Sequence, residues 1–328
     1  MSTALDTAAL PARTPGRLGR LAGEALFWAA WIGAYFAFPD YLPLLGQVAI
    51  AALFALSLDL IVGYAGIVTL GHAAFFGLGA YTAGLLAVHG WGEPLSGLLL
   101  AAAAAALLGL VTAPLVLRGG DLAGLMVTLG IAMMLYEAAN KAAPLTGGAD
   151  GLQGVEVWPV LGIWRFDLFG QTAYLYSLAV LVLLFWLARL VVASPFGLAL
   201  RGIKANARRM HALGTPVRAR LVAAYALSAA YAGVAGALLA QTTQFVSLDV
   251  LAFHRSAEGL LMLVLGGLGS LYGGVLGAVV FVVAHHVLSE MTPQFWQFWI
   301  GAALVALALA GRGGILGLLA ALLRRGRG

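Results

Sequence analysis

Cysteine is absent from this chain of 328 residues, and only 9% of its residues are charged. Without cysteine there is no disulfide framework, no thiolate catalysis and no cysteine-ligated metal. A soluble domain carries roughly a quarter charged residues, whereas 62% of this chain is hydrophobic. Such a chain cannot cover itself with polar surface. The sequence therefore predicts an all-α integral membrane protein, since helices pair their own backbone groups in lipid.

Enzyme signatures are also missing. The chain has no GxxxxGK[ST] phosphate-binding loop, no HExxH pair and no GxSxG elbow. It offers no convincing pair of carboxylates inside an apolar run, which an ion-coupled carrier would usually bury. The net charge of +5 comes from basic residues clustered at the ends and in one loop, which indicates membrane topology rather than nucleic acid binding. We expect no catalytic residue, no metal site and no bound cofactor.

Long apolar runs fill most of the chain, and a membrane span needs about 20 such residues. They predict a membrane domain over 24–311, with a tail on either side at 1–23 and 312–328. Inside this domain, 139–171 is expected to be an external loop and 194–217 a cytoplasmic one. The candidate spans lie at 24–38, 41–62, 67–88, 95–117, 121–138, 172–193, 218–241, a long apolar region at 256–288, and 294–311.

Basic residues predict the orientation of these spans. Arginines in both tails, and seven basic residues between 201 and 220 if His211 is counted, place the tails and the second loop in the cytoplasm. Two cytoplasmic tails require an even number of crossings. The region 256–288 would be about 50 Å long as one helix, too long for a core of about 30 Å. The glycine-rich GGLGSLYGG at 266–274 is expected to break it into two shorter helices, or into a re-entrant turn and one span, giving about ten membrane segments.

The sequence of the cytoplasmic loop predicts one short helix over residues 198–213. Pro195 ends the preceding span, and Gly214 stands in the usual position past a helix end. A helix with firm stops, tied between two spans, can act as a rigid lever that docks on a partner. The alternative is a basic loop that serves only to set topology.

One stretch combines glycines with a histidine inside an apolar segment: GYAGIVTLGHAAFFGLGAY, residues 63–81. Its small residues at four-residue spacing, such as Gly79 and Ala83, fit close helix packing. His72 has two main interpretations. It either hydrogen-bonds a neighbouring hydroxyl such as that of Thr69, or it lines a pathway through the membrane. A metal site would need further ligands, and none lies nearby in the sequence.

Four stretches in this order resemble the permeases of branched-chain amino-acid ABC importers, specifically the LivM-like type. The resemblance as a whole extends from about residue 60 to residue 310, which is most of the chain. They are GYAGIVTLGHAAFFGLGAYTAGLL (63–86), LTGGADGL (145–152), the segment 194–240, and LLMLVLGGLGSLYGGVLGA (260–278).

The resemblance implies a fold similar to the vitamin B12-type importer permeases and a place in the bacterial inner membrane. It implies a second, LivH-like permease subunit, two cytoplasmic ATP-binding subunits that carry ATP and Mg, and a periplasmic solute-binding protein. Branched-chain or other hydrophobic amino acids are the expected cargo. Urea, short amides and aromatic acids are the alternative within this class, and a stand-alone channel or ion-coupled carrier is the alternative outside it.

The resemblance also implies roles for particular residues. The coupling element that meets the ATPases would run from about Leu198 to Gly214. Its candidate residues are Arg201, Lys204, Asn206, Arg208, Arg209, His211 and Gly214. Candidates for the translocation path or for helix packing are Tyr64, Thr69, His72, Phe76, Tyr81, Gly266, Gly267 and Gly269.

The chain departs from the family pattern in two places. Ile67 stands where the first motif often has glutamine, and the coupling turn ARRMHALG, residues 207–214, lacks the acidic residues often found there. These departures bear on the substrate and on the contacts with the ATPases.

Overall fold

A computed structural model describes residues 17–119, 121–167 and 169–295, and beyond them 298, 299, 301, 302, 305, 314, 315 and 317. Most residues of the predicted last span, 294–311, and of the C-terminal tail, 312–328, lie outside the described residues. So does the N-terminal tail up to residue 16.

The described part of the chain is helical, with no β-strand and two isolated β-bridges. It divides into two compact units between Leu42 and Pro43. The main helices are α1 (Arg17–Ala37), α2 (Leu42–Leu58), α3 (Ala73–Val88), α4 (Pro94–Val116), α5 (Asp121–Lys141), α6 (Ala143–Thr146), α7 (Gln171–Ala193), α8 (Pro195–Ala212), α9 (Val217–Thr243), α10 (Phe253–Gly266) and α11 (Leu271–Met291).

Six of the described helical segments are long and apolar enough to cross a membrane. The first combines the short 3₁₀ turn η1 (Pro39–Tyr41), α2 and a π-helical segment, η2 (Asp59–Ala65). Gly66 ends η2 with φ at +78°, a conformation that glycine adopts without strain.

The start of one predicted span is wrong in the first half of the chain. The span predicted at 67–88 begins as a helix only at Ala73, because the chain runs without helical structure from Gly66 to Gly71. The remaining helix, α3, is about 24 Å long at 1.5 Å per residue. Near the N-terminus, helix α1 begins at Arg17, inside the stretch 1–23 that the sequence predicts to be a tail.

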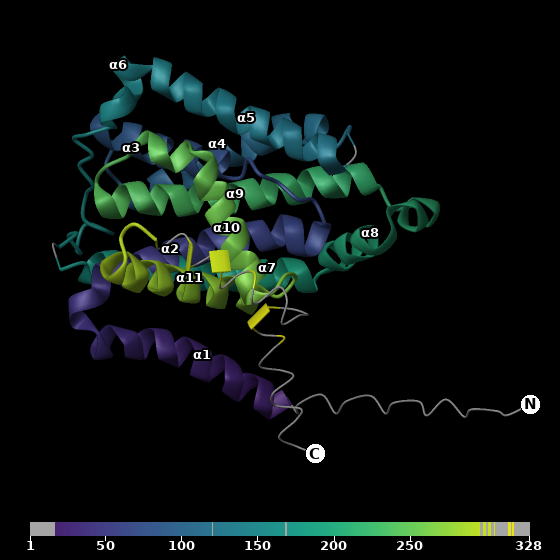
Figure 1. Cartoon of the computed structure of the whole chain (residues 1–328), viewed down its shortest axis with the longest axis horizontal. Coiled ribbons are helices and arrows are strands. Elements are labelled where there is room, and N and C mark those ends of the chain that lie inside the picture. The colour runs from purple at the N-terminus through teal and green to yellow at the C-terminus, as the bar shows by residue number, and fades with distance from the viewer. Residues whose placement is uncertain are drawn as a thin grey trace, which may run out of the picture. The chain divides into compact units, whose positions relative to one another are not determined.

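Helix α9 lies at the centre of the second unit, and α3 and α4 pack along it (Figure 1). It is buried around most of its circumference. Gly79 of α3 meets the backbone of Gly233 of α9, and Gly236 meets the carbonyl of Phe76, so a Cβ at either glycine would collide with main-chain atoms. The predicted close packing through small residues is confirmed. Dispersion contacts of this kind hold helices together where lipid gives no hydrophobic drive.

The glycine-rich break divides the region 256–288 into two helices, as predicted. α10 ends at Gly266 and α11 begins at Leu271, and the two pack against each other as a hairpin. Gly267 and Gly269 in the connection have φ of +112° and +76°. These values lie in the region that side chains disfavour, so glycine permits the reversal.

The predicted external loop 139–171 contains short structure of its own. α5 extends to Lys141, and α6 and the 3₁₀ turn η3 (Gly148–Asp150) follow it. The backbones of Leu152 and Val246 then pair, which ties this loop to the chain beyond α9.

We predict that Gly79→Val lowers the free energy of unfolding by about 3 kcal/mol, the upper end of the cost of overpacking. The new side chain would meet backbone, which cannot rotate away as a side chain can. The measurement is the thermal unfolding midpoint of the purified protein in detergent. Gly130→Val in α5 is the matched control because nothing lies within 4 Å of a Cβ at that position. Equal midpoints for the two variants would contradict the packing described here.

Candidate functional site

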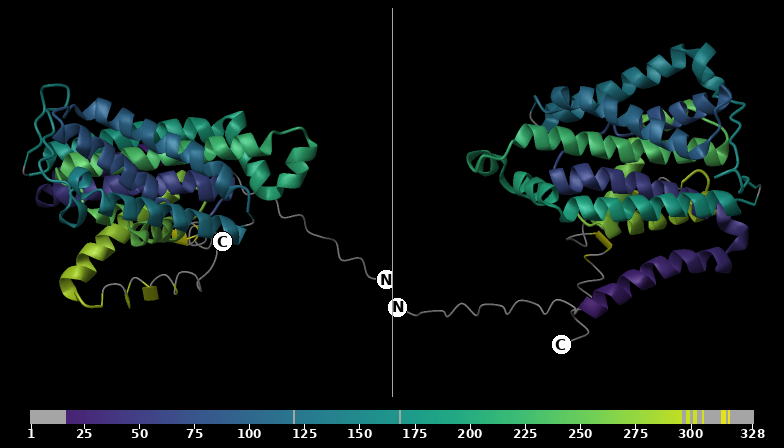
Figure 2. Two further views of the ribbon diagram at one scale, coloured as in Figure 1. Left: turned by 90° about the horizontal axis from the view of Figure 1, so that it is seen from above. Right: turned by 180° about the vertical axis from the view of Figure 1, so that it is seen from behind.

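The basic loop forms α8, which extends beyond the ends of the neighbouring helices (Figure 2). It begins directly after α7, with the Ser194 hydroxyl accepting a hydrogen bond from the Phe196 amide at 3.2 Å and Pro195 in the first turn. Both features favour a helix start. Beyond its end, Gly214 has φ at +80°, so the predicted stop is confirmed. The start lies three residues before the predicted Leu198.

A corner divides α8 at Asn206, whose backbone is extended with φ at −162° and ψ at 96°. Its side-chain Oδ1 accepts a hydrogen bond from the Arg209 amide at 2.9 Å, so it caps the turn that follows. The prediction of a single rigid helix over 198–213 is therefore wrong. The asparagine side chain can hydrogen-bond a nearby backbone amide in place of the regular helical pattern, which allows the helix to bend there. Helix α8 therefore consists of a proximal segment, 195–205, and a distal segment, 207–212.

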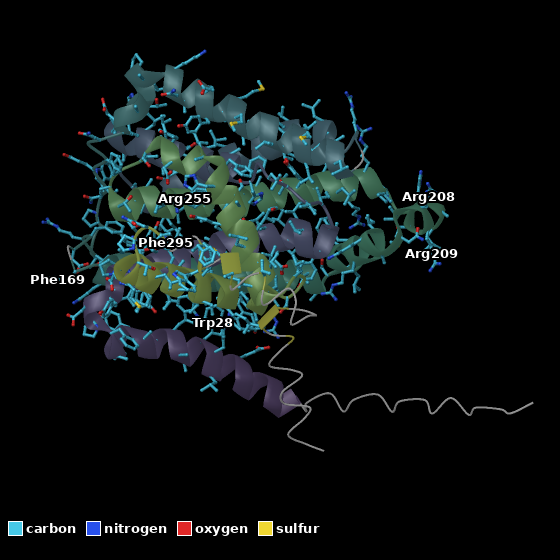
Figure 3. The ribbon with its side chains drawn as sticks, in the orientation of Figure 1. Trp28, Phe169, Arg208, Arg209, Arg255 and Phe295 are labelled. Atoms are coloured by element: carbon cyan, nitrogen blue, oxygen red, sulfur yellow. The ribbon has the colours of Figure 1, made fainter. Side chains whose placement is uncertain are left out.

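The distal segment carries exposed basic side chains. Arg208, Arg209 and His211 are all exposed. Figure 3 shows Arg208 and Arg209 at the tip of the projection, pointing away from the other helices. A compact cationic surface of this kind can attract an acidic partner and guide its approach.

The proximal segment is bound to the end of the α2 span. Leu200 and Ile203 are buried. The Lys204 ammonium donates hydrogen bonds to the carbonyls of Gly63, at 2.6 Å, and Val62, at 3.4 Å. These carbonyls belong to η2, where a π-helix leaves the normal hydrogen-bond pattern, as often happens at functional sites.

A second contact joins the same two elements. The guanidinium of Arg201 lies over the buried ring of Tyr64, 5.2 Å from its centroid. Such a cation–π contact is worth about 0.5–1 kcal/mol at an exposed site. Of the predicted coupling residues, Arg201 and Lys204 thus contact the end of the α2 span, whereas Arg208 and Arg209 point away from the other helices.

Asp59, at the start of η2, is fully buried, and one carboxylate oxygen accepts a hydrogen bond from the Gly269 amide at 2.7 Å. Gly63 permits this approach, because a Cβ there would collide with the Asp59 carboxylate. The Asp59 carboxylate also interacts electrostatically with Lys204. Residue Asp59 is missing from the predicted site. An acid inside an apolar run is a signal that the sequence does contain. The contact itself could not be predicted, because Gly269 lies 210 positions away from Asp59.

The predicted glycines of the break contribute in different ways. Gly269 donates its amide to Asp59. Gly266 lies where α10 and α11 touch, and a Cβ there would collide with the Gly273 carbonyl. Gly267 turns the chain between the two helices with φ at +112°. The break therefore connects η2 to the α10–α11 hairpin.

His72 lies in a separate buried centre and is 1% exposed. Its Nε2 is 2.9 Å from the Ser57 hydroxyl of α2 and 3.5 Å from the Ser228 hydroxyl of α9. The rings of Phe54 and Phe75 lie 5.6 and 5.5 Å away, centroid to centroid. Thr69, the partner suggested by the sequence, instead accepts a hydrogen bond from the Gly71 amide. These contacts favour the packing interpretation of His72.

The other predicted path residues are dispersed. Tyr81 is buried, and its hydroxyl has no hydrogen-bond partner among the described residues. Phe76 packs on Phe54 at 5.0 Å between ring centroids, and of the predicted residues it alone lines the cavity between α2, α3, α9, α10 and α11 in the described structure. Within the described ranges, no group of three or more His, Asp or Glu residues is arranged to hold a metal ion.

Comparison with known proteins gives a consistent set of similarities. Residues 41–309 match the family model described as "Branched-chain amino acid transport system / permease component". The high-affinity branched-chain amino acid transport system permease protein LivM of Escherichia coli (strain K12) is 30% identical over 280 residues, covering 77% of this chain and 64% of that protein. The protein of the same name from Salmonella typhimurium (strain LT2) is 31% identical over 281 residues, with the same coverage.

The alignments thus span just under two thirds of the length of these two relatives. No solved structure matches the chain.

We predict that His72→Ala lowers the free energy of unfolding by about 2–5 kcal/mol, since it opens a cavity in a packed centre and leaves the Ser57 hydroxyl without the imidazole. The yield of folded protein and the solute uptake of the assembled transporter should fall in proportion. His89→Ala is the control, because that ring is exposed and its Nδ1 bonds the Leu85 carbonyl of its own helix one turn away. A loss of uptake with an unchanged thermal midpoint would favour a role in the path instead.

Proposed function

This chain belongs to the permease-component family of branched-chain amino acid transport systems, and on that premise we propose that it is the membrane subunit of an ATP-driven importer for branched-chain or other hydrophobic amino acids. The family is a transport component and not an enzyme. In the proposed assembly, ATP and Mg are bound by partner subunits, and this chain passes their movement to the transport path.

The observation that carries this proposal is the two-part lever α8. Its distal segment presents Arg208 and Arg209 outward, and its proximal segment is bonded through Lys204 to the end of a buried span. A loop that served only to set topology would need charge but no such joint. A stand-alone channel would have no use for a projecting, anchored helix.

The proposed assembly contains a second, LivH-like permease, two cytoplasmic ATP-binding subunits and a periplasmic solute-binding protein, in the bacterial inner membrane. Both tails, 1–23 and 312–328, and the coupling loop 194–217 would be cytoplasmic, and the loop 139–171 would be external. The membrane domain 24–311 would contain ten segments and resemble the vitamin B12-type permeases. These segments are α1, α2 with η2, α3, α4, α5, α7, α9, α10, α11 and the predicted span 294–311.

We propose that movement passes from α8 to the α10–α11 hairpin through η2. A displacement of the proximal segment pulls on the Gly63 carbonyl through Lys204. Asp59, one turn earlier on η2, holds the Gly269 amide of the hairpin break. Helix α8 and the α10–α11 hairpin are thus both hydrogen-bonded to η2. Such contiguous bonded elements can transmit a shift of packed helices of the shear type.

Charge reversal at the tip, Arg208→Glu with Arg209→Glu, is expected to reduce ATP-dependent uptake in proteoliposomes at least about tenfold, through weaker docking of the ATP-binding subunits. The measurements are co-purification of those subunits and uptake of radiolabelled leucine. The membrane domain should keep its thermal midpoint, since both side chains are exposed.

Lys141→Glu with Arg165→Glu is the matched control, because both exposed basic residues lie within the proposed external loop 139–171. Normal co-purification and uptake in the Arg208/Arg209 variant would argue against the docking role. Uptake by this chain alone, without ATP, would instead support a stand-alone carrier.

Lys204→Met keeps the length of the side chain but removes its hydrogen bonds to η2. We expect the ATP-binding subunits to remain bound while the number of leucine molecules imported per ATP hydrolysed falls several-fold, because the joint behind the docking surface is loosened. The test measures uptake and phosphate release on the same proteoliposomes. If co-purification is lost together with transport, Lys204 supports docking rather than transmission.

A further inference from the structure

A cavity of about 380 Å³ lies between α2, α3, α9, α10 and α11. This volume is within the range of sites that hold a small ligand. Most of its wall is apolar, with Phe54, Phe76, Met262 and Phe281 among the lining side chains. Two charged residues, Arg255 and Glu258, also line it. Arg255 lies well inside the helical body, far from Arg208 and Arg209 at the tip of α8 (Figure 3).

The two charged residues are one turn apart on α10, and an aspartate outside the cavity wall fixes the first of them. Nε and Nη2 of Arg255 contact Asp249 Oδ2 at 3.2 and 3.0 Å. Nη1 contacts Glu258 Oε2 at 3.4 Å. Asp249 belongs to the 3₁₀ turn η4 (Leu248–Leu251), and its other oxygen is 3.0 Å from His254 Nε2. Asp249 therefore holds the guanidinium in place without help from Glu258.

The contact between Arg255 and Glu258 is long for a charged pair. Charge-assisted hydrogen bonds are typically about 2.7–2.9 Å, whereas this one is 3.4 Å. In the described structure it is also the one hydrogen bond that the Glu258 carboxylate makes. The Glu258 side chain is 20% exposed, against 41% for Arg255, so its charge sits deeper in the protein. A partly buried carboxylate with one weak contact gains from a better cationic partner.

A zwitterionic amino acid with an aliphatic side chain matches these features. Its carboxylate can accept hydrogen bonds from the Nη1 edge of Arg255, and its ammonium can donate to Glu258. The aliphatic part would be buried against the phenyl rings and Met262, where each buried CH₂ contributes about 0.8 kcal/mol. A ligand without the ammonium would leave Glu258 without a cationic partner, and a ligand without the carboxylate would use only Glu258 and not the Nη1 edge of Arg255.

We propose that this cavity is a binding station for the zwitterion of an aliphatic amino acid on its passage through the permease. Arg255 binds the carboxylate, Glu258 binds the ammonium, and the apolar wall selects the side chain. This inference rests on the proposed function and adds to it a site on this chain. Neither charge is among the residues singled out from the sequence, because Arg255 and Glu258 stand at the start of the long apolar region 256–288.

The test uses the complex of both permeases and both ATP-binding subunits in nanodiscs, without the solute-binding protein, so that the ligand meets the membrane domain directly. The probe is photo-leucine, a leucine analogue with a diazirine in its side chain, followed by mass-spectrometric mapping of the labelled peptides. We expect labels on the segments that contain Met262 and Phe281. Excess L-leucine should prevent labelling, whereas leucinamide, which lacks the carboxylate, and 4-methylpentanoate, which lacks the ammonium, should not.

Glu258→Gln should reduce this labelling about tenfold, since it removes one charge from the site and keeps the shape of the side chain. Arg255→Lys keeps the charge beside Asp249 but loses the planar fork, and it should weaken labelling as well. Glu137→Gln, on the exposed surface of α5, is the matched control. Thermal midpoints equal to that of the wild type show that the variants are folded.

Leucine uptake by the complete importer in proteoliposomes separates the two hypotheses. If uptake depends on ATP but labels fall outside the cavity, or both single-charge analogues protect as well as leucine, the binding station is wrong and the importer assignment stands. Unchanged labelling in Glu258→Gln and Arg255→Lys has the same meaning. If the complete importer takes up no leucine with ATP, the proposed function fails for this substrate and the binding station fails with it.

Discussion

Every backbone polar group inside a membrane protein needs a partner, because lipid supplies none, and at η2 these partners come from distant parts of the chain. The carbonyls of Val62 and Gly63 accept hydrogen bonds from Lys204, which belongs to the projecting loop. The amide of Gly269, in the connection between α10 and α11, donates to Asp59. Pairing at one irregular segment therefore joins the lever, the buried span and the hairpin. The position of α8 relative to the membrane domain depends on this junction.

The remainder of the second unit provides a firm support for the junction. α3 and α4 pack along α9 so closely that main-chain atoms meet at Gly79 and Gly236. His72 links the start of α3 to α2 and α9 through its contacts with the Ser57 and Ser228 hydroxyls. Beside it, the Ser256 hydroxyl of α10 accepts a hydrogen bond from the Ala73 amide. Short polar side chains thus bind the start of α3 to three other helices. Displacement of η2 is more easily passed to the hairpin when the surrounding helices do not yield.

The sequence predicts those features that depend on local chemistry. Apolar runs locate most spans, Pro195 and Gly214 mark the limits of α8, and the glycines at 266–274 mark the break. It does not predict features that depend on distant pairing. Nothing near Asp59 indicates Gly269, and the serines that meet His72 lie on two other helices. The corner at Asn206 is an intermediate case, because asparagine tolerates helix and cap alike and the geometry around it decides between them. The late start of α3 has the same origin, since the sequence from Gly66 to Gly71 is apolar enough to read as helix.

The corner at Asn206 separates two surfaces that a straight helix would combine. The proximal segment of α8 is constrained by its contacts with Tyr64 and Gly63, while most side chains of the distal segment, Arg208 and Arg209 among them, are exposed. Substitutions in the distal segment can accumulate without disturbing the joint, so recognition of a partner and response to that partner can evolve independently. If the proposed docking role holds, such a chain could acquire a different ATP-binding partner by altering one turn of helix, with the contacts between α8 and η2 left intact.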